Sequence, residues 1–386
     1  MADSWRRFAS TVAWLVLLLQ AGCYPTLGPL ARLGRHNGPV PIEETPPKLR
    51  VGSLPYPLPL IPLETVPADD LGRHVYEGSF APFWAGEVSR GIVYTERAGF
   101  LDIAHIRNAA DLTRYAYLHV REALREERSG VILVSAEPSL YHITFAYDDA
   151  WREMPTEERE AVERELALRL SQRLAHVMCT WHEIITWYGY RALLPIPERQ
   201  SAFSYDDPPS HMVGIELAGR ALRALHEEWE DDEALYEEAL TSLLGKDLER
   251  YEVQPPVVAR RAARAVKNDW WTSSPGHLKR RLVHVGCNEE ALHPWLVPAG
   301  EGEAEQADPI AWVLPTLTDV LGRDCRGMVT VEIEPNIWEG ASIRRDLALP
   351  DGHISPRRHF GRLAEVIRAE EAERWGSDSA DTSFAE

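Results

Sequence analysis

The chain lacks the short motifs that mark several common kinds of enzyme. It has no Gly-x-Ser-x-Gly elbow, no phosphate-binding loop and no dinucleotide-binding glycine fingerprint. No internal repeat is found either. Hydrolysis by a serine nucleophile and nucleotide chemistry therefore have no positive sign in the sequence.

Cysteine is scarce, with four residues in 386, and no two of them are spaced as C-x-x-C. A structural zinc site built on cysteines is therefore not supported. Apart from Cys23, three cysteines remain, which in an oxidising compartment allows one disulfide and one free thiol. Cys179 lies in a predicted helix with an apolar face, so we expect it to be the buried thiol. Cys287 and Cys325 are then the expected bridge.

The N-terminal hydrophobic run is too short to span a bilayer. It covers Thr11–Leu19, nine residues, whereas a membrane-spanning helix needs about 20. Arg6 and Arg7 precede the run, and small residues follow it up to Cys23. This three-part pattern is typical of a signal peptide, which we assign to residues 1–22.

Ala21-Gly22-Cys23 resembles the lipobox of bacterial lipoproteins. The resemblance implies that Cys23 is diacylated, becomes the first residue of the mature protein and anchors the chain in a membrane. Tyr24 is not the Asp that typically marks inner-membrane retention, which implies an outer-membrane lipoprotein that is exported and faces the periplasm. Gln20 departs from the usual Leu. The alternative is an ordinary cleaved signal peptide followed by secretion.

Positive charge is in deficit, because 41 basic residues face 60 acidic ones and the net charge is −19. A surface this negative repels phosphate backbones, so we expect no nucleic-acid partner. It suits a site that collects cations, or partner proteins of the cell envelope.

Proline divides the chain. Eleven of the 28 prolines lie between residues 24 and 68, and proline excludes helix and central strand. We expect residues 23–69 to form an extended spacer behind the lipid anchor, its later half lying along the globular surface. Residues 70–375 are expected to form one globular domain, and residues 376–386 a disordered tail.

Hydrophobic periodicity predicts an α+β fold, predominantly helical, with a small and mostly antiparallel sheet. The predicted helices span residues 112–127 (starting as early as 102), 155–190, 209–227, 232–247, 256–270 and 357–375. The predicted strands span residues 91–95, 130–135, 141–147, 282–285 and 328–333, the second and third forming a hairpin.

Two segments carry unexplained polar groups in apolar surroundings. In the first, residues 99–111, Asp102, His105, Arg107 and Asp111 crowd the start of a helix. Asp102 and His105 would share a helix face if the helix starts early. The plainer interpretation is a capping aspartate and a partly exposed histidine.

The second segment, Cys179–Gly189, lies deep in the longest helix. His182, Glu183 and Thr186 share one side of it, and His176 stands one turn before Cys179. The segment resembles the metallopeptidase motif His-Glu-x-x-His, but Thr186 occupies the place of the second histidine. The alternative is a structural His/Glu pair satisfied by an arginine or by the backbone. His142, on a predicted strand, faces either the same pocket or solvent.

Three segments together resemble a known family. They are Gly99–Thr113, Trp181–Gly189 and Arg199–Asp207, in the same order along the chain. The family consists of uncharacterised bacterial envelope (lipo)proteins classed as a domain of unknown function, and the resemblance covers roughly residues 85–345. It implies no activity, but it implies that the three segments belong to one domain and meet in space.

These observations lead to one hypothesis and one alternative. In the hypothesis, an envelope lipoprotein carries a metal-dependent hydrolytic pocket that acts on an envelope polymer. His105, His182 and Asp102 bind a divalent metal such as zinc, and Glu183 is the catalytic base. In the alternative, the His/Glu cluster is structural and the protein is a non-catalytic envelope lipoprotein that binds partner proteins.

Overall fold

The computed structural model of the protein describes most of the chain between residues 46 and 376. The described residues are 46–47, 49–50, 52–57, 63–76, 90–135, 137, 139–190, 198–225, 232–272, 277–286, 290–298, 307–349 and 352–376. The predicted signal peptide, Cys23, Cys287 and the C-terminal tail lie outside them. Within these ranges, no helix has the length and hydrophobicity needed to cross a membrane.

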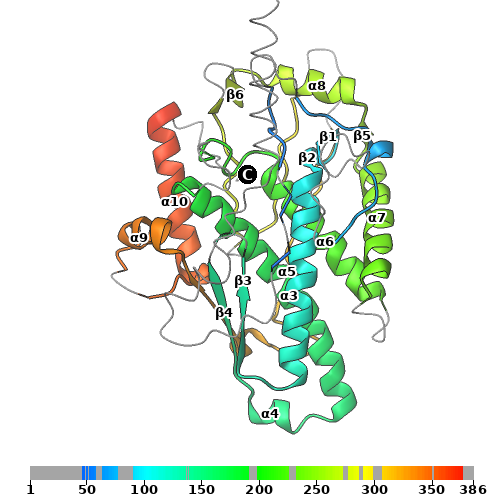
Figure 1. The fold of residues 1–386 in the computed structure, drawn as a ribbon, viewed down its shortest axis with the longest axis vertical. Coiled ribbons are helices and arrows are strands. Elements are labelled where there is room, and N and C mark those ends of the chain that lie inside the picture. Colours follow the sequence, from blue (N-terminus) through cyan, green and yellow to red (C-terminus); the bar gives the residue numbers. More distant parts are fainter. Residues whose placement is uncertain are drawn as a thin grey trace, which may run out of the picture.

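Three helices form the centre of the molecule, as Figure 1 shows. They are α3 (Ile103–Arg125), α5 (Thr156–Trp187) and α6 (Asp207–Ala224). α3 packs against both α5 and α6. The apolar stripe of α5 is buried, as its three-to-four spacing predicts. Gly214 of α6 lies so close to the carbonyl of Ile106 on α3 that no side chain would fit there.

Two small antiparallel sheets adjoin the helices, one near the N-terminal end of α3 and the other beside α3. The first has the order β2 (Gly99–Asp102), β1 (Ile92–Thr95), β5 (Val253–Gln254), and the second β3 (Gly130–Val134), β4 (Leu140–Phe145), β8 (Val329–Glu334). The predicted hairpin is confirmed, because β3 and β4 pair antiparallel. The strand predicted at 282–285 is wrong, since that segment is irregular.

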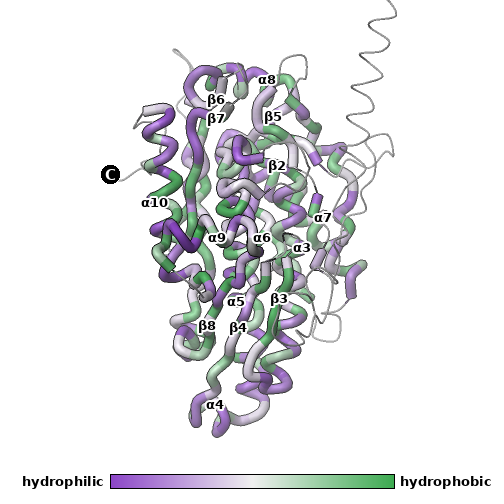
Figure 2. Tube along the Cα trace, turned by 60° about the vertical axis from the view of Figure 1, so that its left-hand side comes forward, coloured by the Kyte–Doolittle hydropathy of each residue, from purple (hydrophilic) through white to green (hydrophobic). Residues whose placement is uncertain are grey.

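Further elements surround this core. They are α4 (Asp149–Arg152), α7 (Glu233–Arg250), α8 (Pro256–Ala265), α9 (Ile337–Asp346), α10 (Pro356–Trp375) and the short pair β6 (Trp271–Thr272) and β7 (His277–Leu278). Figure 2 shows β3 as hydrophobic, whereas α10 alternates between hydrophilic and hydrophobic residues, as expected of an outer helix. The fold is α+β and predominantly helical, which confirms the predicted class.

The chain enters the folded body earlier than predicted. Tyr56, Leu63 and Val66 are buried, although they lie in the segment that we expected to be a spacer. Tyr56 stacks on Trp271 with ring centroids 5.9 Å apart. The expected boundary near residue 70 is therefore corrected, because apolar residues between the prolines pack into the core. We call residues 49–57, of which residue 51 is not described, the strap.

The cysteines are placed in part. Cys179 is a buried free thiol, as expected. Cys325 is also buried and free, so the structure does not support the bridge to Cys287. A hydrophobic interior explains this, because Cys325 packs in the core among residues such as Leu317 and Met328.

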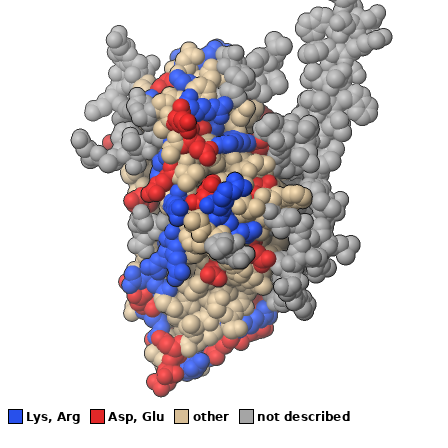
Figure 3. Space-filling view, turned by 90° about the vertical axis from the view of Figure 1, so that its left-hand side faces the viewer, with Lys and Arg blue, Asp and Glu red and all other residues tan. Residues whose placement is uncertain are grey.

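The surface carries both signs of charge despite the acidic balance of the chain. Figure 3 shows basic and acidic side chains side by side on the face that includes α9 and α10. One such pair is formed by Arg199 and Glu370. The excess of acidic residues is thus not displayed as one continuous acidic patch on this face.

Candidate functional site

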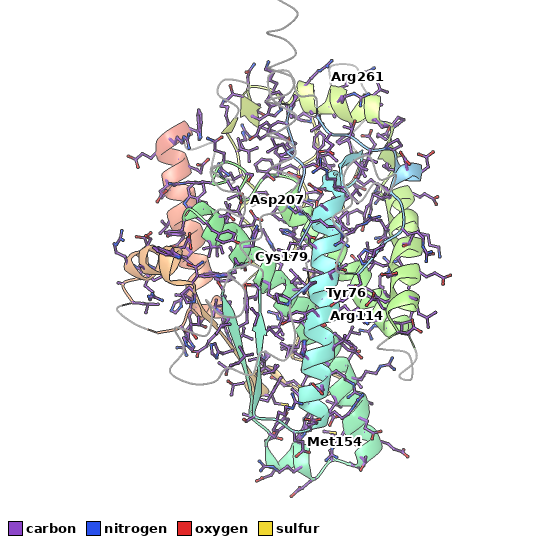
Figure 4. The ribbon with its side chains drawn as sticks, viewed as in Figure 1. Tyr76, Arg114, Met154, Cys179, Asp207 and Arg261 are labelled. Atoms are coloured by element: carbon purple, nitrogen blue, oxygen red, sulfur yellow. The ribbon has the colours of Figure 1, made fainter. Side chains whose placement is uncertain are left out.

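The three polar segments meet where α3 and α6 begin and α5 ends. The strand β2 leads directly into α3, and Asp102 caps the helix: its Oδ1 accepts the N–H of Ala104 at 2.6 Å. The backbone N–H of Asp102 donates to Ser210 Oγ on α6 at 2.8 Å. Figure 4 labels Asp207, at the start of α6, and Cys179, on α5; both are buried in the interior.

Asp102, His105 and Asp206 form a group that could hold a metal ion. Each offers one ligand atom, and these atoms all lie within 4.8 Å of one another. Asp102 and Asp206 are fully buried, whereas the His105 side chain is 21% exposed. The group is thus mostly buried, and only part of the His105 side chain reaches solvent. The sequence pointed to Asp102 and His105, but it did not single out Asp206.

Asp206 is the least satisfied member of the group. Its Oδ1 accepts the hydroxyl of Ser204 at 2.6 Å, but its Oδ2 is buried without a hydrogen-bond partner among the described residues. Burial and the negative charges of Asp207 and Asp102 raise the pKa of Asp206 well above its usual value. Burial likewise raises the pKa of Asp102, although His105 and the N–H groups of Ser53 and Ala104 oppose the shift.

His105 sits between the carboxylates of two helix starts. Its Nδ1 lies 2.9 Å from Asp207 Oδ1. Burial favours the neutral ring, but Asp207 and Asp102 outweigh it and raise the pKa of His105 well above 6.5. Gly52 of the strap covers the other ring edge, and a Cβ there would lie 2.5 Å from His105 Nε2. The strap therefore closes one side of the site.

Glu183 approaches this group from α5. Its Oε2 accepts the backbone N–H of Phe203 at 2.8 Å, which fixes the carboxyl. Burial and the charge of Asp207 raise the pKa of Glu183 to about 7, while His182 and His105 act in the opposite direction. A carboxyl balanced near neutral pH suits a general base, as the hypothesis requires.

His182 does not join the metal-ligand group, contrary to the expected ligand set. In the described part of the chain, neither group of potential metal ligands contains it. Successive residues of a helix point about 100° apart, so His182 faces Glu137, with Nδ1 3.5 Å from Oε2. Burial opposes its charge, but Glu137 raises the pKa of His182 to about 9. Asp206 takes its place in the corrected set.

Arg107 and Asp111 hold the N-terminal segment rather than line the same group. The Arg107 guanidinium donates to the carbonyls of Leu71 and Gly72 at 2.8 and 3.0 Å. Asp111 Oδ2 lies 2.7 Å from Arg50 of the strap, and Oδ1 lies 2.9 Å from His74 Nε2. Burial favours a neutral Asp111, but Arg50 and His74 lower its pKa.

The other predicted pocket residues are dispersed. His176 lines a cavity of about 500 Å³ between α5, β8 and the start of α10. Thr186 is buried, and its hydroxyl has no hydrogen-bond partner within the described ranges. His142 lies on β4, with Nε2 3.1 Å from Glu334. His176 belongs to no group of potential His, Cys, Asp or Glu metal ligands among the described residues.

The third segment, residues 199–207, contained the signal for Asp206. The sequence alone favours Asp207 or Ser210 as the helix cap, but the residue at the cap position is Asp206, without a capping side-chain bond. Asp207 Oδ2 instead accepts the N–H of Ser204 at 2.9 Å. A helix start needs only one capping aspartate, so the second of the two adjacent aspartates before Pro208 was the signal for a further role.

The family to which the chain belongs is shown by comparison of its sequence with known protein families. The family model described as "Protein of unknown function (DUF4056)" matches residues 46–283. The chain belongs to this family. The match begins earlier than the resemblance at residue 85 and takes in the strap and all three polar segments. Comparisons with curated proteins and with solved structures found no match.

Proposed function

We propose that this protein is a metal-dependent hydrolase in which Asp102, His105 and Asp206 bind a divalent cation such as zinc. One observation carries the proposal: the buried Oδ2 of Asp206 has no hydrogen-bond partner among the described residues and lies in a group with a second buried carboxylate and a histidine. Buried polar atoms are normally satisfied, so an unsatisfied carboxylate oxygen beside two other potential ligands favours the binding of a cation.

The charge balance supports the same conclusion. Asp102, Asp206, Asp207 and Glu183 supply four carboxyl groups, and the imidazoles that favour their charged forms are those of His105 and His182. Buried charges are stable only when they are paired or bind a metal. Two imidazoles offset at most two negative charges, whereas a divalent cation would offset two more.

Glu183 is the proposed catalytic base. A bound divalent cation lowers the pKa of its coordinated water toward about 7. Glu183 would accept a proton from such a water, because its carboxyl is fixed by the Phe203 N–H and its pKa is about 7. His211 would remain neutral, since burial and the positive charges of His105 and His182 hold its pKa well below 6.5.

The competing function is a non-catalytic envelope protein with a structural polar network. Asp102 favours it, because this carboxylate already caps α3 and accepts the N–H of Ser53 in the strap. Such a network would hold the strap against α3 without any chemistry. The two functions differ in whether Asp206 binds a cation and whether Glu183 is needed for hydrolysis.

The proposal also includes the cellular location of the protein. The signal-peptide pattern and the lipobox-like Ala21-Gly22-Cys23 support export and a lipid on Cys23. An outer-membrane lipoprotein facing the periplasm meets peptidoglycan and other envelope polymers, which are the proposed substrate class. Mass spectrometry of the mature N-terminus tests the anchor: a diacylated Cys23 is expected, and an unmodified N-terminus at another residue would contradict it.

Elemental analysis of protein purified without chelator tests the metal. We expect bound divalent metal, or its uptake on zinc incubation, and the loss of one equivalent in Asp206→Asn. The matched control is Asp247→Asn, since Asp247 is a buried aspartate that already pairs with Arg220 at 2.7 Å. An unchanged metal content in Asp206→Asn would contradict the assignment.

Digestion of purified peptidoglycan tests the catalytic role. Glu183→Gln should keep the metal but release soluble fragments at least about 100-fold more slowly, the usual contribution of a general base. A wild-type protein that binds metal but releases nothing, under the same conditions, would favour the structural alternative for this substrate.

A further inference from the structure

A second cluster of histidines and glutamates lies on the sheet β3–β4–β8. His142 on β4 is paired in register with Glu332 on β8, and Glu334 lies two residues further along the same strand. Residues two apart on a strand share a face, so both glutamates point to the same side. His353 joins them because Ile354 pairs with Ile333 through an isolated bridge.

The cluster converges on one carboxylate oxygen. His142 Nε2 lies 3.1 Å from Glu334 Oε2, and His353 Nε2 lies 3.9 Å from the same oxygen. The two imidazole rings are stacked, with centroids 4.5 Å apart and planes inclined by 22°. Both rings therefore present Nε2 to the same small volume, and the three ligand atoms lie within 4.8 Å of one another.

These distances fit side chains that bind a transition-metal ion directly. In a tetrahedral zinc site with bonds of about 2.0–2.1 Å, neighbouring ligand atoms lie about 3.4 Å apart. The observed 3.1 and 3.9 Å bracket this separation. All three side chains are partly exposed, so water can occupy a fourth position.

Glu332 contacts the other ring nitrogen of His353. Its Oε2 lies 3.5 Å from His353 Nδ1, on the side of the ring away from Glu334. Metal-binding histidines commonly donate their other ring N–H to a carboxylate, which fixes the ring and its tautomer. If these histidines and glutamates formed only surface ion pairs, the two ring nitrogens of His353 would not need to face two different carboxylates.

We propose that His142, His353 and Glu334 bind a zinc-class divalent cation, with Glu332 as a positioning residue for His353. Two imidazoles and one carboxylate favour zinc, nickel or copper over magnesium or calcium, which prefer oxygen ligands. The site shares no residue with Asp102, His105 and Asp206, so it is independent of the proposed function. It links β4 and β8 to the segment before α10.

The site also borders the cavity of about 500 Å³. Glu332 lines that cavity together with His176 and the first residues of α10, Pro356, Arg357 and Arg358. A cation on His353 would therefore lie beside the cavity wall. Its effect on α10 should be measurable as slower amide exchange in the first turns of that helix when zinc binds.

Zinc titration of full-length protein carrying Asp206→Asn tests the site, because this variant removes the ligand set around Asp102. One zinc equivalent is expected to bind. His353→Ala and His142→Ala in the same background should each abolish it, and Glu332→Gln should weaken it about 10-fold. His293→Ala, at an exposed histidine elsewhere, is the matched control and should leave binding unchanged.

Two results would overturn the proposal. One is the absence of zinc binding in the Asp206→Asn protein, and the other is binding that survives both histidine substitutions. Magnesium in place of zinc should give no saturable binding at this site. Circular dichroism of each variant shows whether it is folded, and we expect these partly exposed side chains to tolerate substitution.

Discussion

Replacing Asp206 by asparagine should make the metal-free protein more stable. The carboxylate is fully buried, its Oδ2 lacks a hydrogen-bond partner within the described ranges, and Asp102 lies in the same group. Asparagine keeps the shape and an acceptor for Ser204, and it removes the negative charge. Residues retained for binding commonly reduce stability, so a gain on substitution marks a functional position.

The magnitude follows from the spacing of the group. Two unit charges at the 4.8 Å limit would repel by about 3.5 kcal/mol at an effective dielectric constant of about 20, and the raised pKa of Asp206 means that protonation relieves part of this repulsion. His105 is in the same group, and its attraction to Asp206 offsets part of this repulsion. We therefore expect a gain of about 1–2 kcal/mol, or a rise in Tm of about 2–4 °C per kcal/mol.

Thermal and urea unfolding in the presence of a chelator measure this change. Asp247→Asn should change the free energy of unfolding in the opposite direction. Asp247 is buried but pairs with Arg220, so removing its charge should destabilise the protein by about 1–3 kcal/mol. Zinc should raise the Tm of the wild type more than that of Asp206→Asn. Destabilisation by Asp206→Asn equal to that of Asp247→Asn would refute the reasoning.

Three further predictions concern the strap and the separate cavity that His176 lines. Arg50→Ala leaves the buried Asp111 paired with His74 alone and should lower the free energy of unfolding by about 3 kcal/mol. The control Arg90→Ala breaks an exposed ion pair with Glu64 and should lower it by less than about 1 kcal/mol. Equal losses of stability in urea unfolding would contradict this prediction. Gly52→Ala places a Cβ 2.5 Å from His105 Nε2, so it should lower the free energy of unfolding by about 1–3 kcal/mol and weaken zinc binding. The control Gly245→Ala, on α7 with open space around it, should raise the free energy of unfolding by about 0.5–1 kcal/mol. Calorimetry in which both substitutions change the stability in the same direction would count against the close contact. Burial, together with the charges of His284 and Arg173, lowers the pKa of His176 to about 3, so the stability from its neutral form is complete above about pH 6.5 and falls as the pH decreases. By pH 5 the wild type should have lost about 2 kcal/mol more than His176→Gln, at 1.36 kcal/mol per pH unit, and parallel stability–pH curves would refute it.

Local patterns in the sequence predicted much of the fold. The apolar stripe of α5, the β3–β4 hairpin and the last helix follow from periodicity and turn residues. The prediction of a strand at 282–285 was wrong because short apolar runs also occur in buried irregular segments. Here the N–H of Leu282 donates a hydrogen bond to the carbonyl of Phe203, which lies far away in the sequence. The expected spacer of residues 23–69 differs from the structure for a related reason: prolines exclude a helix, but they do not prevent Tyr56 or Val66 from being buried.

The candidate site was predicted only in part. Asp102 and His105 share a helix start, so their proximity follows from the sequence. The rotation of α5 decides that Glu183 faces this group while His182 faces Glu137, and periodicity alone does not fix which polar residue points to which neighbour. The position of Asp206 in this group depends on the close packing of α6 against α3 at Gly214, and this packing is a feature of the tertiary structure.

The central claim is that Asp102, His105 and Asp206 bind a divalent cation. Anomalous X-ray diffraction at the zinc edge, from crystals grown with zinc, tests it most directly. We predict an anomalous peak within bonding distance of these three side chains, with Glu183 beside it. A well-ordered site with no peak there, in crystals that hold zinc elsewhere, would contradict the account.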